Sequence, residues 1–267
     1  MPSSTFYGRE RRITSREMAD FKIIKKYFDK GRSKDGIRQL KMVIEREEGL
    51  IFNHKRIARI KKKFGLLTQV RKKNKYRYFA KKKQEHETCA NLLDRNFESV
   101  RPDEIYSTDI TTLKYGKKKA YVAAVKDLCT KEIVGFEVSR RIDLEVAHVA
   151  VEKAIASITD SKKKNLMIHS DQGFHYTHFA YRSMLESQGV TQSMSRKGNC
   201  LDNAPIESFF GLLKDHLDLR DCKNITDVRK EVTRKIKYYN QVRPQLGLKK
   251  MPPSEFRRLC KTNEGFY

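Results

Sequence analysis

The sequence predicts an α/β domain, a mixed sheet flanked by helices, preceded by an all-α domain. Apolar residues recur at helical spacing near the N-terminus, a basic segment follows, and β-prone runs then alternate with helical stretches. The 267 residues suffice for one large domain or two smaller ones. The expected boundaries are a helical domain at 1–68, a basic linker at 69–100, the α/β domain at 101–245 and a C-terminal tail at 246–267.

The N-terminal domain should contain three helices. Ser15 is positioned to cap the first, which stops at Gly31, and the second starts near Gly36 and ends near Gly49. Asn53 is positioned to cap the third, "HKRIARIKKKF". Its inward-facing positions are Ile57, Ile60 and Phe64.

The second and third helices, joined by a short turn, predict a helix-turn-helix that binds DNA. The alternative is an ordinary helical hairpin with a solvated basic face. The candidate DNA-contacting residues of the third helix are Lys55, Arg56, Arg59, Lys62 and Lys63.

A basic run extends from Lys55 to Lys83, with 14 Lys or Arg and no Asp or Glu. Such a run is often a solvated linker. Beside a helix-turn-helix, we interpret it as an arm that follows the phosphate backbone and makes affinity salt dependent.

After Pro102, three β-prone runs at 104–113, 119–128 and 132–140 predict an antiparallel meander. A helix with Asp143 as its cap follows. After it come a short strand near 165–171, a helical stretch near 177–188, a strand near 190–195 and the helix that holds Glu207. A last helix, capped by Thr226, should pack on the sheet. Its inward positions are Val228, Val232, Ile236 and Tyr239.

The charge balance indicates a polyanionic partner. The chain has 58 Lys and Arg against 33 Asp and Glu, a formal net charge of +25. Residues 1–100 hold 28 basic and 12 acidic residues, so the N-terminal third is the most strongly basic part. Nucleic acid is the default partner of such a chain.

Cysteine usage and hydropathy argue against export and membrane insertion. The five cysteines are scattered without a C-x-x-C pair, which predicts reduced thiols in a cytoplasmic protein. The N-terminus carries charges where a signal peptide needs an apolar core, and no run approaches the roughly 18 apolar residues of a membrane span.

Three carboxylates stand out. Asp109 lies within a strand, where Asp is disfavoured, and Asp171 directly follows a strand, where α/β sheets present ligands. Glu207 lies in the first turns of a helix that Asn203 and Pro205 would start well. Taken singly, each has an ordinary structural explanation: a strand-edge residue, a turn former and an acid at a helix N-terminus.

Together, the three acids predict a metal site. If the fourth strand joins the sheet beside the first, Asp109 and Asp171 are neighbours, and the helix brings Glu207 across them. Converging carboxylates repel one another unless cations lie between them, and carboxylate oxygens suit Mg²⁺ or Mn²⁺. Such a site performs two-metal phosphoryl transfer.

The motifs "STDIT", "HSDQG", "SMSRKGNCLDNAPIESFFGLLK" and "YYNQVRPQLGLKKMPPSEF" resemble those of insertion-sequence transposases, the second-reading-frame (OrfB) type of the IS-three family. This family has an RNase H-like integrase core. Between Asp171 and Glu207 lie 35 residues, the spacing of the family's DDE triad. Lys214 stands two helical turns after Glu207, where the family carries a basic residue close to the DNA end.

The resemblance implies a bacterial transposase that acts on DNA in the cytoplasm. Asp109, Asp171 and Glu207 would be catalytic and hold two Mg²⁺ or Mn²⁺ ions. Water would first cut a phosphodiester at the element's end, and the freed 3′-hydroxyl would then attack target DNA. No P-loop pattern occurs, in agreement with a reaction that needs no nucleoside triphosphate.

The resemblance also implies partners: double-stranded DNA, as element ends and target, a homo-oligomer on DNA, and an upstream-frame (OrfA) protein or an OrfA–OrfB fusion. Because the chain begins at Met1 without an obvious leucine zipper before residue 30, we expect the unfused product.

The segment before Glu207, "SRKGNCLDNA", is predicted to be a loop that orders around a DNA end. Arg196, Lys197 and Asn199 are its candidate DNA-binding residues. The alternative is a plain solvated loop. His169 is a candidate donor to the metal ligands, or a structural histidine at a strand end.

Three other functions compete. A DNA-binding regulator would use the carboxylates only structurally, and a metal-dependent nuclease would cut without joining. Tyr238 and Tyr239 could suggest a tyrosine recombinase, but that class needs an Arg/His constellation around its nucleophile. The triad spacing with Lys214 disfavours the regulator, and the helix-turn-helix with the loop motif disfavours the nuclease.

Overall fold

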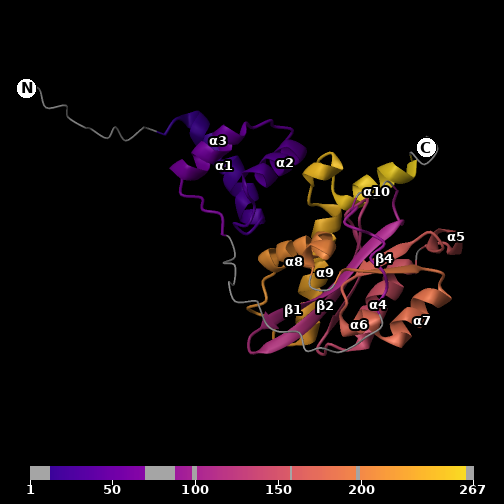
Figure 1. Ribbon diagram of the computed structural model, residues 1–267. Coiled ribbons are helices and arrows are strands. Elements are labelled where there is room, and N and C mark those ends of the chain that lie inside the picture. The colour runs from indigo at the N-terminus through magenta and orange to yellow at the C-terminus, as the bar shows by residue number, and fades with distance from the viewer. Residues whose placement is uncertain (1–12, 70–87, 98–100, 157, 197–198, 263–267) are drawn as a thin grey trace, which may run out of the picture. The chain divides into compact units, whose positions relative to one another are not determined.

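The computed structural model describes residues 13–69, 88–97, 101–156, 158–196 and 199–262. The chain divides into two compact units, Met1–Val70 and Arg71–Tyr267. Each unit has its own helices or strands (Figure 1). Each unit also has its own cluster of buried apolar side chains. None of the helices in the described residues is long and apolar enough to cross a membrane.

The N-terminal unit contains the three expected helices: α1 (Ser15–Lys30), α2 (Ile37–Glu48) and α3 (His54–Lys63). The first begins differently from the expectation, because Thr14 and not Ser15 is the cap. Thr14 and Glu17 form a reciprocal capping box. Asn53 caps α3 as expected, since its side-chain oxygen accepts from the Lys55 N–H at 2.9 Å.

One apolar core joins these three helices. Helical spacing puts the apolar side chains of each helix on one stripe, and the stripes pack together. The buried members are Ile24, Tyr27, Phe28, Leu40, Ile44, Phe52, Ile57 and Ile60. Phe64 is partly buried and stacks on Phe21 with 4.1 Å between ring centroids.

The C-terminal unit is built on a five-stranded sheet in the order β3-β2-β1-β4-β5. The strands are β1 (Ile105–Tyr115), β2 (Lys118–Asp127), β3 (Ile133–Ser139), β4 (Met167–Ser170) and β5 (Thr191–Met194). The first three form the expected antiparallel meander. The fourth lies parallel to β1 and the fifth parallel to β4, so the sheet is mixed and β1 and β4 are neighbours.

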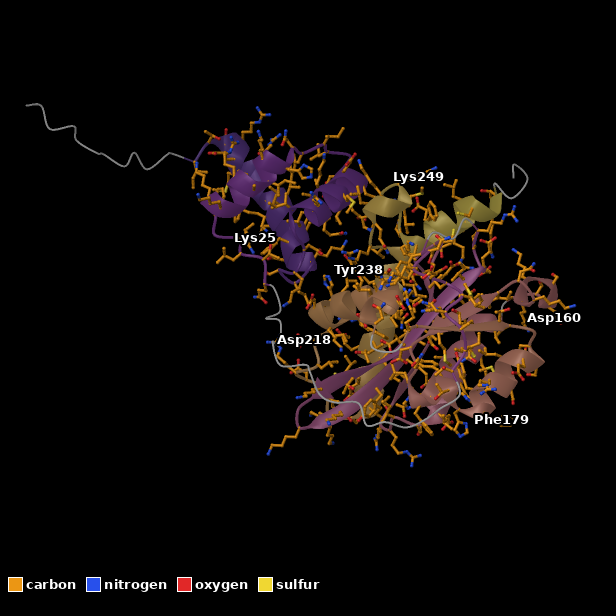
Figure 2. All side chains as sticks on the ribbon, in the orientation of Figure 1. Lys25, Asp160, Phe179, Asp218, Tyr238 and Lys249 are labelled. Carbon is orange, nitrogen blue, oxygen red and sulfur yellow. The ribbon has the colours of Figure 1, made fainter. Side chains whose placement is uncertain are left out.

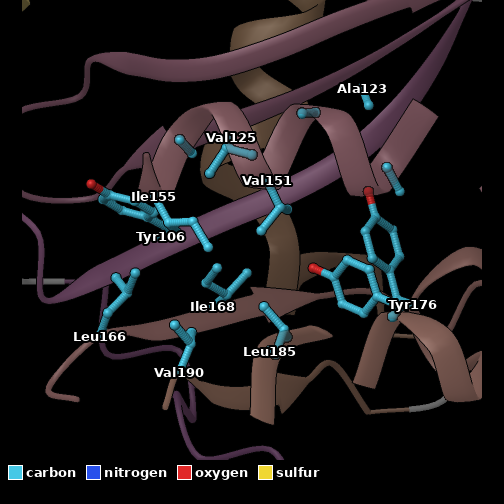
Figure 3. Packing of buried hydrophobic residues seen from close by; sticks show 14 of the residues in the cluster. Tyr106, Ala123, Val125, Val151, Ile155, Leu166, Ile168, Tyr176, Leu185 and Val190 are labelled. Atoms are coloured by element: carbon cyan, nitrogen blue, oxygen red, sulfur yellow. The ribbon is translucent and has the colours of Figure 1, made fainter. Parts of the chain in front are cut away.

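Helices cover both faces of the sheet. One face packs against α4 (Leu144–Ile155), α6 (Phe174–Thr177) and α7 (Phe179–Ser187). Figure 3 shows this core, where Tyr106, Val151 and Ile168 meet. Gly135 allows α4 close to β3, because a Cβ there would stand 2.2 Å from the Ala150 carbonyl oxygen.

The opposite face packs against α8 (Ala204–His216) and α9 (Ile225–Gln241). The four predicted inward positions of α9 are all buried. Its cap is Asn224, in a capping box with Asp227, and not Thr226 as expected. Asp143 stands at the N-cap position of α4 but makes no side-chain capping bond. The remaining elements are α5 (Asp160–Lys163), η1 (Cys200–Asn203), η2 (Leu246–Leu248) and α10 (Pro253–Thr262).

Residues 88–97, the described end of the expected linker, dock on the sheet edge. The Met194 N–H of β5 donates to the Ala90 carbonyl at 3.3 Å, and Ser193 Oγ accepts from the Leu92 N–H at 3.0 Å. The basic stretch at 70–83, with Tyr76, Tyr78 and Phe79, lies outside the described residues.

Candidate active site

The first carboxylate, Asp109, lies within β1 on the sheet face that α8 covers. Side chains alternate along a strand, so Ser107, Asp109 and Leu113 share one face, and Leu113 belongs to the core with α8. The Ile110 N–H donates to Asp109 Oδ1 at 2.7 Å. Burial, the Asp171 carboxylate and, to a smaller extent, Glu207 raise the pKa of Asp109 to about 7.

The second carboxylate, Asp171, directly follows β4. Its Oδ1 accepts from the Gly173 N–H at 2.8 Å, which fixes the side chain over the turn. A Cβ at position 173 would stand 2.7 Å from that oxygen, so a larger residue there would displace the carboxylate. This contact explains the glycine of the "HSDQG" motif. Because β4 pairs with β1, Asp171 lies just past the end of the strand next to the one that holds Asp109.

The third carboxylate, Glu207, lies in the first turn of α8. Its side chain is exposed. Partial desolvation by the surrounding protein and the nearby Asp171 carboxylate raise the pKa of Glu207. Lys214, two turns further on the same helix, lies close enough to lower the pKa of Asp109, against the larger effects that raise it.

The fold thus brings three acids from β1, the end of β4 and α8 into one another's electric field. Each of these acids comes from a different element, and 98 positions of chain separate Asp109 from Glu207. Within the described residues, no group of three or more Asp, Glu, His or Cys side chains has the arrangement of a metal site. The three carboxylates are close enough to affect one another's pKa, but they do not form a complete set of metal ligands.

His169 is a buried structural link between strands. Its Nδ1 lies 2.9 Å from Ser193 Oγ, and its Nε2 lies 3.1 Å from Ser195 Oγ. Burial lowers the pKa of the ring to about 4, so the imidazole is neutral near pH 7. Both ring nitrogens are therefore occupied by serine hydroxyls on and just after β5.

The loop before α8 is tied down by a buried acid, Asp202. Its carboxylate accepts from Arg196 through Nε and Nη2 at 3.0 Å each, and from Arg95 Nε at 2.8 Å. Asn91 Nδ2 donates to the same carboxylate at 3.1 Å. Half-exposed Arg196 is thus held by an internal partner. The side chain of Lys197 lies outside the described residues, and Asn199 is half-buried.

The five candidate DNA-contacting residues of α3 fall into two groups. Arg56 binds Asp20 through Nε and Nη2 at 2.6 Å each, and Lys63 binds Glu17 at 2.7 Å, so these two cations hold α3 to α1. Exposed positions make up the other group: Lys55, Arg59 and Lys62. Lys55 and Arg59 also line an open hollow of about 490 Å³ between the N-termini of α1 and α3.

Sequence reasoning missed the polar contacts of Ser107, Thr108 and Lys126 with the start of α8, and it expected Asn203 only as a helix cap. Ser107 Oγ donates to Asn203 Oδ1 at 2.6 Å, and Asn203 Nδ2 donates to the Thr108 carbonyl at 3.2 Å. Lys126 Nζ donates to the Pro205 carbonyl at 2.9 Å. The available signal was Lys126 itself, a charged residue within the apolar run "YVAAVKDL".

Family models match along most of the chain. An HTH-like domain matches residues 15–74, and two models of an integrase core domain match residues 99–200 and 188–253. These matches confirm the helix-turn-helix and the integrase core that the motifs predict.

Curated relatives agree with the family models. The putative transposase InsK for insertion sequence element IS150 of Escherichia coli (strain K12) is 34% identical over 96% of this chain and 90% of its own. An uncharacterized transposase-like protein of Haemophilus influenzae is 35% identical over 81% of this chain and 98% of its own.

The fold resembles that of a solved retroviral assembly, the simian T-cell lymphotropic virus intasome in complex with PP2A regulatory subunit B56 gamma. The TM-score is 0.51 at 15% identity, covering 66% of this chain and 60% of that one. This likeness confirms the RNase H-like integrase fold of the mixed sheet and its helices. The family models and the curated relatives together show that the chain belongs to the IS3 family of insertion-sequence transposases, with an integrase core and an HTH-like domain.

Proposed function

We propose that Asp109, Asp171 and Glu207 are the catalytic residues of this transposase and hold two divalent cations, Mg²⁺ or Mn²⁺. The observation that carries the proposal is that the Asp109 carboxylate lies in the field of both other acids. Gathering like charges costs free energy, and a cation between them removes that cost. Bound there, such cations activate an attacking oxygen and stabilise the leaving oxygen of a phosphodiester.

The donor set fits hard cations. All three side chains offer carboxylate oxygens, which Mg²⁺ and Mn²⁺ prefer. Asp109 and Asp171 each accept a hydrogen bond from a backbone N–H, at 2.7 and 2.8 Å, and these contacts orient the two carboxylates. Glu207 is exposed on a long side chain, so it is able to close on the other two.

In the proposed reaction, the chain's own residues hold the DNA beside the carboxylates. Lys214 carries its charge on the same helix as Glu207, where it would neutralise a phosphate beside the carboxylates. Water would be directed first onto a phosphodiester at the element's end, and the freed 3′-hydroxyl then onto target DNA. Neither step forms a covalent bond to the protein.

The exposure of the other basic side chains decides how we expect each of them to contact DNA. Lys55, Arg59 and Lys62 would meet phosphates directly. Arg56, Lys63 and Arg196 would do so only beside their internal carboxylate partners. The loop residues Lys197 and Asn199 belong to the same proposal.

We also propose the division of labour along the chain: residues 1–68 bind DNA, 69–100 link, 101–245 catalyse, and 246–267 pack on the core. The active form would be a homo-oligomer that pairs two element ends, with an upstream-frame protein or fusion that supplies end-specific binding. This work would take place on bacterial DNA in the cytoplasm.

A strand-transfer assay tests the proposal. Purified protein is incubated with a pre-cut DNA end bearing a free 3′-hydroxyl and a plasmid target, with and without Mg²⁺. Asp171→Asn is run beside it, and Asp160→Asn serves as a control. Asp160 is an exposed acid paired with Lys163, at the edge of the unit in Figure 2.

Joined product that needs Mg²⁺, survives in Asp160→Asn and vanishes in Asp171→Asn would support the proposal. Metal-dependent cutting without joining would favour a nuclease. DNA binding with neither activity, even after the upstream-frame protein is added, would favour the regulator.

A further inference from the structure

We propose that Asn203 is a positioning residue that sets Glu207 against Asp109, with Lys126 as its support. The inference rests on the proposed function, because it concerns the geometry of the carboxylates assigned there. It adds a requirement that the triad alone does not contain, namely that the first turn of α8 is fixed to the sheet by polar contacts.

The Asn203 side chain forms hydrogen bonds with the sheet and not with its own helix. Asn203 occupies the N-cap position of α8, where Asn usually accepts from a backbone N–H of the first turn. Here it makes no capping bond. Instead, it accepts from Ser107 Oγ at 2.6 Å and donates to the Thr108 carbonyl at 3.2 Å.

These contacts join the two catalytic elements directly. Thr108 immediately precedes Asp109 in β1, and Asn203 lies four residues, about one helical turn, before Glu207. Ser107, Thr108 and Asn203 are all buried, so water does not compete for their hydrogen bonds. A buried pair of hydrogen bonds therefore bridges the strand of one acid and the helix of another.

Lys126 supports the same turn from the next strand. It lies opposite Ser107 in the β1–β2 register, and its amine donates to the Pro205 carbonyl at 2.9 Å. Only 7% of its surface is exposed, and in the described part of the chain its amine forms no salt bridge. Burying an amine that has a single helix carbonyl as its partner costs stability. An apolar residue at this position would avoid that cost. The contact instead fixes where α8 begins.

The anchors matter because small displacements of catalytic groups are costly. Phe209, Phe210 and Leu213 hold α8 to the sheet by apolar packing, which is not directional. Asp202, just before Asn203, fixes the incoming loop. Without Asn203 and Lys126 the first turn could shift by about 1 Å, a displacement that can cost about 100-fold in rate.

The test compares Asn203→Ala with Asn240→Ala. Asn240 is a matched control, because it also bonds a strand backbone from a helix: its Oδ1 accepts from the Ile133 N–H at 3.0 Å, and its Nδ2 donates to the Ile133 carbonyl at 2.9 Å. That contact joins α9 to β3, which lies two strands from β1 in the sheet. Ser107→Ala is a milder third variant that removes one donor and leaves Asn203 in place.

Two quantities are measured on the full chain: Mn²⁺ binding, from free Mn²⁺ by electron paramagnetic resonance, and the midpoint of thermal unfolding. For Asn203→Ala we expect Mn²⁺ binding to weaken roughly 10- to 100-fold, the usual effect of losing a group that orients metal ligands. Ser107→Ala should weaken it in the same direction by less. Asn240→Ala should lower the midpoint and leave Mn²⁺ binding unchanged.

If Asn203→Ala and Asn240→Ala lower the midpoint alike and both keep wild-type Mn²⁺ affinity, Asn203 is structural and the inference is overturned. A variant that unfolds is replaced by Ser107→Ala, where unchanged Mn²⁺ affinity has the same meaning. Wild-type protein that binds no Mn²⁺ would overturn the proposed function itself, and the inference with it.

Discussion

Two groups of carboxylates in the C-terminal unit lie close to β1 and differ in the charges around them. The first group surrounds an arginine, and the second consists of acids that lie near one another. At the start of the strand, Arg257 of α10 contacts Asp103 at 2.8 Å, Asp127 at 2.7 Å and Glu132 at 2.6 Å. In the middle of the strand, Asp109 shares its surroundings with Asp171 and Glu207. In the described part of the chain, neither Asp109 nor Glu207 forms a salt bridge.

The difference separates a structural cluster from the cluster that we propose is functional. Burial acts to raise the pKa of Asp103, but the Tyr106 hydroxyl and Arg257 outweigh it and the pKa is lowered. Around Asp109, burial and the other acids raise the pKa together. The first cluster contains its own cation. In the second cluster, the effects that raise the pKa of Asp109 outweigh the nearby charge of Lys214, and in the proposed function an added cation would relieve the repulsion between the acids.

The largest expected effect comes from removing one acid of the functional cluster. Glu207→Gln should lower strand transfer by at least about 10³-fold, since several kcal/mol of charge stabilisation depend on the bound cations. DNA binding should persist, because the folded chain and its basic residues are unchanged. Gel-shift and strand-transfer assays on the same preparation measure both, and lost binding would show that Glu207 is needed for folding.

The structural cluster should respond in stability. Arg257→Met removes the cation from two buried carboxylates and should lower the free energy of unfolding by about 3–5 kcal/mol. Denaturant titration of wild type and variant measures the loss. Lowering the pH should shrink the difference, because protonated carboxyls no longer need the arginine. A loss below about 1 kcal/mol would contradict the assignment of this cluster as structural.

The same division between partnered and exposed charges predicts different effects along α3. Lys62→Ala should weaken DNA binding and flatten the plot of log affinity against log salt by about 0.9, the value of one phosphate contact. Lys63→Ala should change that slope less, because Lys63 already binds Glu17. Fluorescence anisotropy over a salt series distinguishes them. Equal slopes for Lys62→Ala and wild type would show that this face does not touch phosphate.

The smallest effect is a pH dependence in the N-terminal unit. A hydrogen bond from Lys63 and one from the Thr14 backbone lower the pKa of Glu17 from 4.5 to about 2. A depressed carboxyl pKa stabilises the fold above pH 4.5, and that contribution is lost as the pH falls toward 2. Hydrogen-exchange protection of α1 should therefore differ between wild type and Glu17→Gln above pH 4.5, and the difference should disappear toward pH 2. A difference that persists at pH 2 would contradict this account.

Much of the fold could be predicted because it follows from local patterns. Helical spacing gave α1 to α3, and the change to β-prone runs after Pro102 gave the meander. Each of the three acids has an ordinary explanation when taken singly, and they could be selected together only from the expected strand order and the 35-residue spacing of the family motif. Their proximity needed one assumption about strand order, that the fourth strand lies beside the first, and the sheet confirms it.

What could not be predicted depends on contacts between distant residues. Nothing local marks Arg257 as the partner of Asp103, 154 positions away, or Asn203 as the partner of Ser107, 96 positions away. Two caps were assigned one residue or more from their true positions, because Thr14 and Ser15, like Asn224 and Thr226, are all good caps by residue type. Backbone geometry, which residue type does not determine, selects between them.

The most direct test of the functional cluster is the thermal stability of wild type and Asp109→Asn, each with and without Mn²⁺. Without metal, Asp109→Asn should unfold at a higher temperature, because one of three repelling charges is gone. With Mn²⁺, the wild type should gain stability by ligand binding and the variant should gain much less. Equal shifts in both proteins, or a wild type that Mn²⁺ leaves unchanged, would contradict the assignment of these carboxylates as the metal site.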